Sequence, residues 1–439
     1  MAKAPSGTTS GIRSNNDMVF DLLHSTAPET MELGTEHHYN QYITCCLHKA
    51  ISSRRVTGNG EIEKMATQAD SGRARLKEAY HHLGAHPFSA VEFTLIKIFV
   101  DYNAWDTIPD EGDIAVTELA EKIGGSFEVV DRMVTFFIAG KVLESTAPGR
   151  IAHTEKSRIY KSDQPLSWLC VHMFNNVFRP LAQLPGFFAK YGLASPQNVR
   201  LTPLGLAHGY DDKPAYDIIV ADKAVHKGFN KALRELGGMY SLKGVYDFGW
   251  LQEGLLATGS GSRAAIVDVG GSHGLALRDA VRNNPFIPAE RCVLFDLPEV
   301  IENTNKNLEK SPDEVLQKVQ KVGGSMFEPY PEAVQGALIY LFRRVLNDFP
   351  DEDVVRAFQN VRKTAAPDTR ILVIEEMLSP KRIPMNVCLD IALMLAAGKR
   401  RNAAMFSELA ERAGFRLNGE FKNVASAFDD FSVLEFVVA

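Results

Sequence analysis

Hydrophobic and polar positions follow two different periods along the chain, and the change between them falls near residue 257. Before it, apolar residues recur every three or four positions, as in SAVEFTLIKIFVDYNAW (89–105) and SWLCVHMFNNVFRPLAQL (167–184), which predicts amphipathic helices. After it, short β-branched runs such as AAIVDV (264–269) and CVLFDL (292–297) alternate with helical stretches. This alternation predicts a parallel sheet with helices on both faces, so the expected fold is α/β and Rossmann-like after a helical N-terminal part.

Four segments follow from these patterns. The polar stretch 1–16 is rich in Gly, Ser, Thr and Asn and is expected to be disordered. Residues 17–165 are predicted to form a helical, winged-helix-like dimerisation domain, and residues 166–256 a helical linker that contributes to the substrate pocket. Residues 257–439 contain the strand–helix alternation and are predicted to form the Rossmann-like domain.

The winged-helix pattern of residues 88–160 raises the question of DNA binding. The second helix of its helix–Gly-Gly–helix unit, SFEVVDRMVTFFIAG (126–140), is apolar and carries Arg132 as its one cation. A recognition helix needs several side chains that donate to phosphates and base edges. We therefore expect no nucleic-acid partner, and instead an apolar surface that pairs two copies of the chain in a homodimer.

Composition narrows the class of protein further. The 439 residues include 48 Lys and Arg against 54 Asp and Glu, a net charge of −6, so a broad positive field for nucleic acid is not expected. The five cysteines lack metal-ligand spacing, and the adjacent His37 and His38 lack a third ligand, so we predict reduced thiols, no metal site and a cytoplasmic location. No run of about 18 uncharged apolar residues occurs, and we expect no membrane segment.

A candidate nucleoside site follows the first predicted strand. The strand runs into Gly270, Gly271 and Gly274, and Asp296 closes the next strand. Glycines there let a ligand approach the backbone, and an acidic residue at that point can accept hydrogen bonds from ribose hydroxyls. The plainer alternative is a tight turn with a solvated Asp. The spacing differs from the dinucleotide fingerprint and no phosphate-binding Lys follows, so the ligand expected is a nucleoside without phosphates.

Six motifs then occur in a recognisable order: VDVGGSHG, FDLPEVIENT, GGSMFEPYP, LFRRVLNDFPDEDVV, RILVIEEML and AGKRRNAAMFSELAERAGF. Over residues 85–437 the chain resembles the plant- and fungal-type small-molecule O-methyltransferases, which have a class I methyltransferase domain. The resemblance implies S-adenosylmethionine or S-adenosylhomocysteine as cofactor, a small-molecule substrate and a homodimer. It also implies the following cofactor-binding residues: Asp268, Gly270, Ser272, Gly274, Asp296, Leu297, Ser325, Met326, Phe327 and Arg343.

Several positions depart from the family pattern. Ser272 replaces a glycine, which fits if its φ is negative, and Ser325 replaces an Asp that accepts from adenine. The family's Leu-His-Asp-Trp, whose histidine is the general base, is Leu-Asn-Asp-Phe here, with Asn347 at the base position. Asparagine cannot take up a proton near neutral pH. Arg400 stands where the plant enzymes have a Glu that orients the base, whereas the remaining family acid is present as Glu375.

These departures favour an enzyme that binds the cofactor but does not methylate. The chain resembles the fungal pericyclases built on this scaffold, which promote dehydration, Diels–Alder, hetero-Diels–Alder or ene reactions of polyketide-derived substrates. Such reactions need a folded substrate and hydrogen-bond donors at a carbonyl rather than a base. The alternative is an O-methyltransferase whose base lies elsewhere or whose substrate is acidic enough to react unaided; a non-enzymatic regulator is disfavoured. The candidate catalytic residues are Asn347, Arg343, Arg400, His172, Asp348 and Glu375.

Overall fold

The computed structural model describes residues 59–223, 226, 228, 230, 242–257, 263–378, 384–422 and 431–439. The chain divides into two compact units, Met1–Pro87 and Phe88–Ala439. The stretch 1–16, predicted to be disordered, and the pair His37 and His38 lie outside the described residues. The four predicted segment boundaries stay predictions.

The long helix α3 (Asn59–Asp101) runs through the boundary between the units. Within it, Ala74–Asp101 is long and apolar enough to cross a membrane. No such segment was expected from the sequence, because Glu92 and Lys97 interrupt the apolar run. One such helix is weak evidence for a membrane segment. Ile96 and Phe99 near its end are buried in a core of the protein's own.

The winged-helix pattern of the sequence is realised as four helices, α4 to α7, and a small sheet. The strands pair antiparallel in the order β1-β3-β2, and β2 and β3 form a hairpin. Phe99, Trp105 and Phe137 meet ring to ring at 4.8–5.1 Å in its core. The elements are α4 (Ala104–Thr107), β1 (Ile114–Ala115), α5 (Val116–Lys122), α6 (Phe127–Ala139), β2 (Leu143–Ala147), β3 (Arg150–His153) and α7 (Glu155–Arg158).

A group of helices follows before the large sheet. They are α8 (Pro165–Met173), the π-helix η1 (Phe174–Phe178), α9 (Arg179–Tyr191), α10 (Pro203–Ala207), α11 (Ala215–Ile219) and α13 (Leu251–Ala257). Later in the chain, α18 (Pro384–Met394) joins them, since Leu204 N of α10 donates to Leu395 O at 3.0 Å. The ring of His208, just after α10, bonds to Asn175 O of η1 at 3.0 Å. These contacts connect α8–α10 with the segment that leads from α18 to residue 400.

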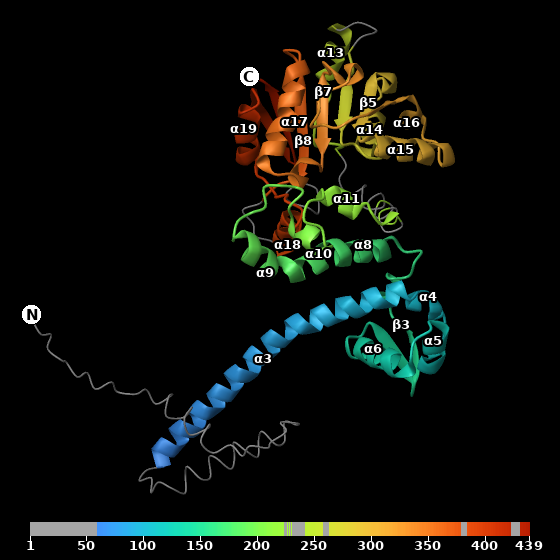
Figure 1. The fold of residues 1–439 in the computed structure, drawn as a ribbon, viewed down its shortest axis with the longest axis vertical. Coiled ribbons are helices and arrows are strands. Elements are labelled where there is room, and N and C mark those ends of the chain that lie inside the picture. Colours follow the sequence, from blue (N-terminus) through green and yellow to red (C-terminus); the bar gives the residue numbers. More distant parts are fainter. Residues whose placement is uncertain are drawn as a thin grey trace, which may run out of the picture. The chain divides into compact units, whose positions relative to one another are not determined.

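The large sheet has seven strands in the order β6-β5-β4-β7-β8-β10-β9. The strands from β6 to β8 are parallel, and β10 pairs antiparallel with β8 and β9. Figure 1 labels β5, β7 and β8 of this sheet. The chain goes from β4 outward to β5 and β6, then returns to β7 on the other side of β4. Ligands bind at the carboxyl ends of the strands at such a switch point. The bounds are β4 (Ile266–Val269), β5 (Cys292–Asp296), β6 (Gln320–Gly323), β7 (Ile339–Arg343), β8 (Arg370–Glu376), β9 (Phe415–Lys422) and β10 (Phe431–Val438).

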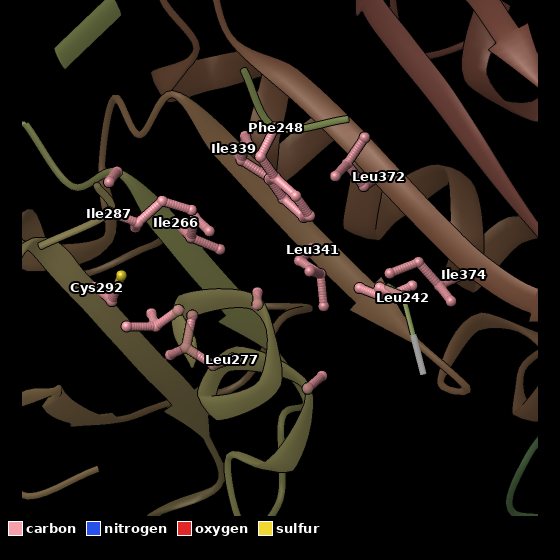
Figure 2. Close-up of a cluster of buried hydrophobic side chains, with 14 of the residues drawn as sticks. Leu242, Phe248, Ile266, Leu277, Ile287, Cys292, Ile339, Leu341, Leu372 and Ile374 are labelled. Carbon is pink, nitrogen blue, oxygen red and sulfur yellow. The ribbon is translucent and has the colours of Figure 1, made fainter. Parts of the chain in front are cut away.

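Helices cover both faces of this sheet because neighbouring strand residues point to opposite sides. Ile266 belongs to one buried cluster, with Leu277 of α14, and Val267 to the other, with Phe358 of α17. Figure 2 shows the first cluster, in which the side chain of Leu277 of α14 lies over the strands. The helices and short turns are α14 (Leu275–Asn283), η3 (Ala289–Arg291), α15 (Pro298–Lys310), α16 (Glu314–Lys318), η4 (Glu332–Val334), η5 (Leu346–Asp348), α17 (Asp351–Thr364) and α19 (Ala403–Glu411). The predicted α/β fold with an N-terminal helical region is confirmed.

Candidate active site

The turn after β4 is the first element of the site. Gly270 has φ 68°, Ser272 φ 51° and Gly274 φ 72°. The condition that Ser272 adopts a negative φ is therefore wrong. The left-handed conformation costs a residue with a side chain roughly 1–2 kcal/mol. The backbone N–H of Ser272 donates to Asp296 Oδ2 at 2.7 Å, and this charge-assisted bond offsets the strain.

Two glycines in this turn have no space for a side chain. A Cβ at Gly271 would lie 2.5 Å from Asp268 Cγ and Leu294 Cδ1, and one at Gly274 would lie 2.8 Å from Leu316 Cδ2. Gly271 was named in the glycine-rich turn from the sequence, but the family resemblance did not place it among the cofactor-binding residues. The two glycines thus let the turn pack directly on these side chains at the switch point of the sheet.

Asp268 is a buried carboxyl beneath this turn. It has no exposed surface, and neither of its oxygens has a hydrogen-bond partner among the described residues. Burial raises its pKa to about 7, the negative charge of Asp296 adds to the rise, and the positive charge of Arg343 opposes it. Leaving such a group unpaired costs about 1–3 kcal/mol or more. The orphaned oxygens therefore indicate a place where a ligand supplies hydrogen-bond donors, with Arg343 close by.

Asp296, at the end of β5, is oriented by backbone donors. Its Oδ1 accepts from Leu297 N and its Oδ2 from Ser272 N, both at 2.7 Å. Burial raises its pKa while these two N–H groups lower it. Each carboxylate oxygen has a second lone pair, so the group can still accept from the two hydroxyls of a ribose.

Tyr216 of α11 is a neighbour of this site that sequence reasoning missed. Its pKa is raised to about 12 by burial and then by the charges of Asp296 and Glu299. Helix α11 is therefore close to the predicted ribose position. In the sequence, Tyr216 is an aromatic residue in a segment rich in Pro and Gly. That pattern does not indicate that Tyr216 lies near Asp296.

The loop after β6 carries the residues expected around the adenine. Ser325 Oγ accepts from Phe327 N at 3.2 Å, and Asn360 Nδ2 donates to Met326 O at 3.0 Å. The Phe327 ring meets the Phe349 ring edge to face at 4.9 Å and lies under the Arg356 guanidinium at 4.7 Å. The adenine contacts of Ser325, Met326 and Phe327 stay a prediction.

The position of the family's base lies in a tight turn after β7, residues 345–349, here called the Asn347 turn. Glu375 of β8 holds this turn: its Oε1 accepts from Val345 N at 2.8 Å, Leu346 N at 2.9 Å and Asn347 N at 3.3 Å. Asn347 Nδ2 donates to Glu375 Oε2 at 3.1 Å and to Glu376 O at 3.2 Å. Burial raises the pKa of Glu375 to about 8, Asp348 adds to the rise, and the backbone N–H groups oppose it. Glu375 is thus a structural acceptor for the turn rather than an accessible base.

Arg401 holds the same turn from its other side. It is fully buried and donates to Leu346 O at 2.9 Å, to Phe349 O at 2.7 Å and to Asp351 Oδ1 at 2.8–2.9 Å. Gly398 leaves room for the turn, because a Cβ there would lie 3.0 Å from Asp348 Cα. Sequence reasoning singled out Arg400 and passed over Arg401.

Arg400, expected to point a donor at the substrate, is 3% exposed and forms an ion pair with Glu376. Its backbone N–H donates to Asp390 Oδ1 of α18 at 2.7 Å. As a donor toward a substrate carbonyl Arg400 stays a prediction, and its pairing with Glu376 weighs against that role.

Asp348 is the exposed carboxyl of the Asn347 turn. The protein around it still removes part of its hydration and raises its pKa to about 6; Glu376 adds to the rise and Arg344 opposes it. A side chain that solvent reaches while protein surrounds it is typical of a concave surface. A carboxyl with such a pKa can accept a proton near neutral pH.

Comparisons with known proteins agree with this geometry. Residues 205–416 match the O-methyltransferase domain family. Methyltransferase phm5 of Pyrenochaetopsis sp. is 37% identical over 358 residues, which cover 82% of this chain and 97% of the relative. Methyltransferase pynC of Aspergillus niger is 37% identical over 362 residues, 81% of this chain and 97% of the relative. The chain belongs to the O-methyltransferase family.

Solved structures share the fold of this O-methyltransferase-family chain. The mitomycin 7-O-methyltransferase MmcR has a TM-score of 0.68 at 21% identity, covering 84% of this chain and all of MmcR. LepI, solved with SAH and a substrate analogue, has a TM-score of 0.67 at 18% identity, covering 92% of this chain and all of LepI. At these identities the likeness shows the fold alone. The chain is therefore an enzyme of the S-adenosylmethionine-binding O-methyltransferase fold.

The residues of the turn after β4 fit the expected cofactor. Gly271 and Gly274 let the backbone of the turn lie directly against Leu294 and Leu316. Asp268 offers unsatisfied oxygens, and Asp296 is set to accept from hydroxyls. Among the described residues, no three His, Cys, Asp or Glu side chains gather in a way that could hold a metal ion.

His172 of α8, a candidate from the sequence, lies in a different polar cluster. Its Nδ1 is 3.1 Å from Nδ2 of Asn176, four residues later in the chain. Burial, and then His226, lower its pKa to about 4, so the ring is neutral at physiological pH. The structure brings together Asn347, Asp348, Glu375 and Arg400, and places His172 with His226.

Proposed function

We propose that this protein transfers the methyl group of S-adenosylmethionine to an acidic small-molecule acceptor, with Asp348 in place of a histidine as proton acceptor. S-adenosylmethionine supplies an electrophilic methyl group when bound. The Asn347 turn holds Asp348 in position, and the turn after β4 and Asp296 hold the cofactor. The observation that carries the proposal is the exposed Asp348 carboxyl, with its pKa raised to about 6, next to the position of the missing base.

The identity of the base limits the class of acceptor. A carboxylate with a pKa near 6 takes a proton readily from an O–H or N–H acid that is nearly ionised at neutral pH. Each unit by which the acceptor's pKa exceeds that of the base costs about 1.4 kcal/mol. Ordinary alcohols and simple phenols therefore react poorly, whereas enols and acidic amides are suited.

The pericyclic reaction that the sequence favoured is the second candidate. Its support is the replacement of the base by Asn347 and the fold shared with LepI at 18% identity. Against it, relatives at 34–37% identity that cover 80–83% of the chain bear the name methyltransferase. Two of its expected donors, Asn347 and Arg400, are engaged with Glu375 and Glu376.

We further propose that the enzyme acts in fungal secondary metabolism on a polyketide-derived substrate, as a cytoplasmic homodimer. OxaC, another structural neighbour with a TM-score of 0.69, was solved with SAH and oxaline. Phe127 and Val129 of α6 are 51% and 53% exposed. Two such apolar side chains on one helix support a surface that a second copy covers.

The test incubates the protein with methyl-labelled S-adenosylmethionine and a panel of enols, acidic lactams and phenols of graded acidity. We expect label to appear in the acidic acceptors and to decrease steeply as the acceptor becomes less acidic. The variant Asp348→Asn should transfer no label. Asp368→Asn, which alters a half-exposed carboxyl paired with Arg263, is the matched control. Conversion of a substrate to an isomer without label transfer would overturn the proposal in favour of the pericyclic reaction.

A further inference from the structure

Asn347 has one hydrogen-bonding atom that the described part of the protein does not use. Its backbone N–H donates to Glu375 Oε1 at 3.3 Å, and its backbone carbonyl accepts from Lys399 N at 2.8 Å. The side-chain Nδ2 donates both of its hydrogens, to Glu375 Oε2 at 3.1 Å and to Glu376 O at 3.2 Å. The remaining atom, Oδ1, is buried and has no hydrogen-bond partner among the described residues.

The neighbours of this amide fix its orientation. Glu376 O is a backbone carbonyl and can only accept, so the group beside it is the NH₂ of Asn347 and not its oxygen. Because two bonds anchor that NH₂, the side chain cannot turn to find a donor for Oδ1. A buried acceptor without a donor is unfavourable. The arrangement therefore indicates a donor that comes from a bound molecule.

The order of the strands shows on which side this donor would lie. Nδ2 is bonded to residues of β8, and Oδ1 leaves the same carbon on the other side, away from β8. Strand β7 lies between β8 and β4, so this is the side of β4 and the turn after it. The Asn347 turn already contacts that turn, since a Cβ at Gly270 would lie 3.0 Å from Val345 Cγ2. Asp268, whose oxygens also lack partners among the described residues, belongs to β4.

We infer that Asn347 Oδ1 holds the methyl acceptor through an N–H or O–H that the acceptor keeps after its acidic group has lost its proton. This inference rests on the proposed function and narrows its substrate class. An amide oxygen accepts a hydrogen bond but takes up no proton near neutral pH. The hydrogen that Asn347 binds is therefore a different one from the proton that passes to Asp348. The preferred acceptors have both groups, as does an enol whose ring also contains an amide N–H.

The test compares two enols that differ in one ring position. The compound 4-hydroxy-6-methyl-2-pyridone has an N–H there, and 4-hydroxy-6-methyl-2-pyrone has an oxygen. The full chain, saturated with S-adenosylhomocysteine, is titrated with each compound in a calorimeter. The quantity compared is the Kd of the pyrone divided by the Kd of the pyridone, because other differences between the compounds cancel when this ratio is compared between variants.

Asn347→Leu keeps the shape of the side chain without its polar atoms. We expect its ratio to be about tenfold lower than that of the parent protein, which corresponds to about 1.4 kcal/mol. Asn347→His should keep the higher ratio, because one ring nitrogen can donate to Glu375 while the other accepts. Asn347→Ala removes the same oxygen with a smaller side chain, so it gives the same test should the leucine variant not fold.

Asn418→Leu is the matched control. Asn418 Nδ2 also donates to a buried glutamate, Glu435, but from β9 at the edge of the sheet. This variant should keep the ratio of the parent protein, and all variants should bind S-adenosylhomocysteine equally.

Two results would overturn the inference. An unchanged ratio in Asn347→Leu and Asn347→Ala would mean that Oδ1 meets water rather than the acceptor. An equal fall of the ratio in Asn418→Leu would mean that the effect is not specific to Asn347. Because binding is measured without methyl transfer, the expected ratios in a protein that transfers no label would refute the proposed function alone.

Discussion

Arg401→Met should destabilise the protein and slow its reaction by releasing the Asn347 turn. The substitution removes the guanidinium donors from Leu346 O and Phe349 O and both bonds to Asp351. Leu346 O keeps the longer bond from Phe349 N at 3.4 Å. Removing one member of a buried ion pair costs about 3–5 kcal/mol. Asp351 is 32% exposed and keeps Lys399 at 2.6 Å, so we expect the lower end, about 3 kcal/mol. A loss of about 3 kcal/mol lowers the Tm of a domain of roughly 150–250 residues by about 6–12 °C.

Calorimetry and label-transfer kinetics measure the two effects. Arg412→Met is the matched control, because its pair with Glu352 is exposed at 47% and 76% and should contribute less than about 1 kcal/mol. Arg401→Lys keeps the charge but cannot span both carbonyls, so it should be intermediate in Tm and in kcat. The KM for S-adenosylmethionine should stay unchanged. Equal Tm values for Arg401→Met and Arg412→Met would refute the idea that Arg401 holds the Asn347 turn. A lowered Tm with normal kcat at low temperature would refute a role of Arg401 in positioning the turn for the reaction.

Four further predictions concern cofactor, base and assembly. Asp296→Asn should weaken S-adenosylhomocysteine binding by about 1–3 kcal/mol in calorimetry. Because Asp348 must be ionised to accept a proton, kcat/KM should rise with pH through about 6, and Asp348→Asn should flatten that limb. Asn347→His can donate to Glu375, as Asn347 Nδ2 does now, so it should extend label transfer to less acidic phenols. Sedimentation should give a dimer, and Phe127→Glu a monomer; a monomeric parent protein would contradict the proposed interface.

The sheet could be predicted because its signal is local. Strands β4, β5, β7, β8 and β10 each read as a short apolar run, since strands covered on both faces bury every side chain. β9 was missed because its exposed and buried positions alternate at the edge of the sheet and Gly419 interrupts it. The turn after β4 was found through its glycines. The φ of Ser272 was misjudged because a hydrogen bond to Asp296, 24 residues away, holds it.

The side chains around the Asn347 turn were harder to predict, for a physical reason. Arg400 and Arg401 are adjacent cations in a loop, and nothing in their sequence indicates which one clamps the turn and which pairs with Glu376. His172 was named from the sequence, and its contact with Asn176 is local, between residues four apart. His226 was not named from the sequence because its contacts with Tyr216 and its effect on the pKa of His172 arise only in the folded chain.

The construction of the Asn347 turn explains why the loss of a histidine is weak evidence for a new reaction. Glu375 binds three backbone N–H groups and Arg401 binds two backbone carbonyls, so the turn is held almost entirely through its main chain. The side chain at position 347 can change while the turn and Asp348 stay in place. A substitution there alters the strength and position of the base, and therefore the acidity required of the acceptor, while the cofactor site keeps its geometry. Methyl transfer to a more acidic acceptor is thus a smaller departure from the family than a change of reaction class.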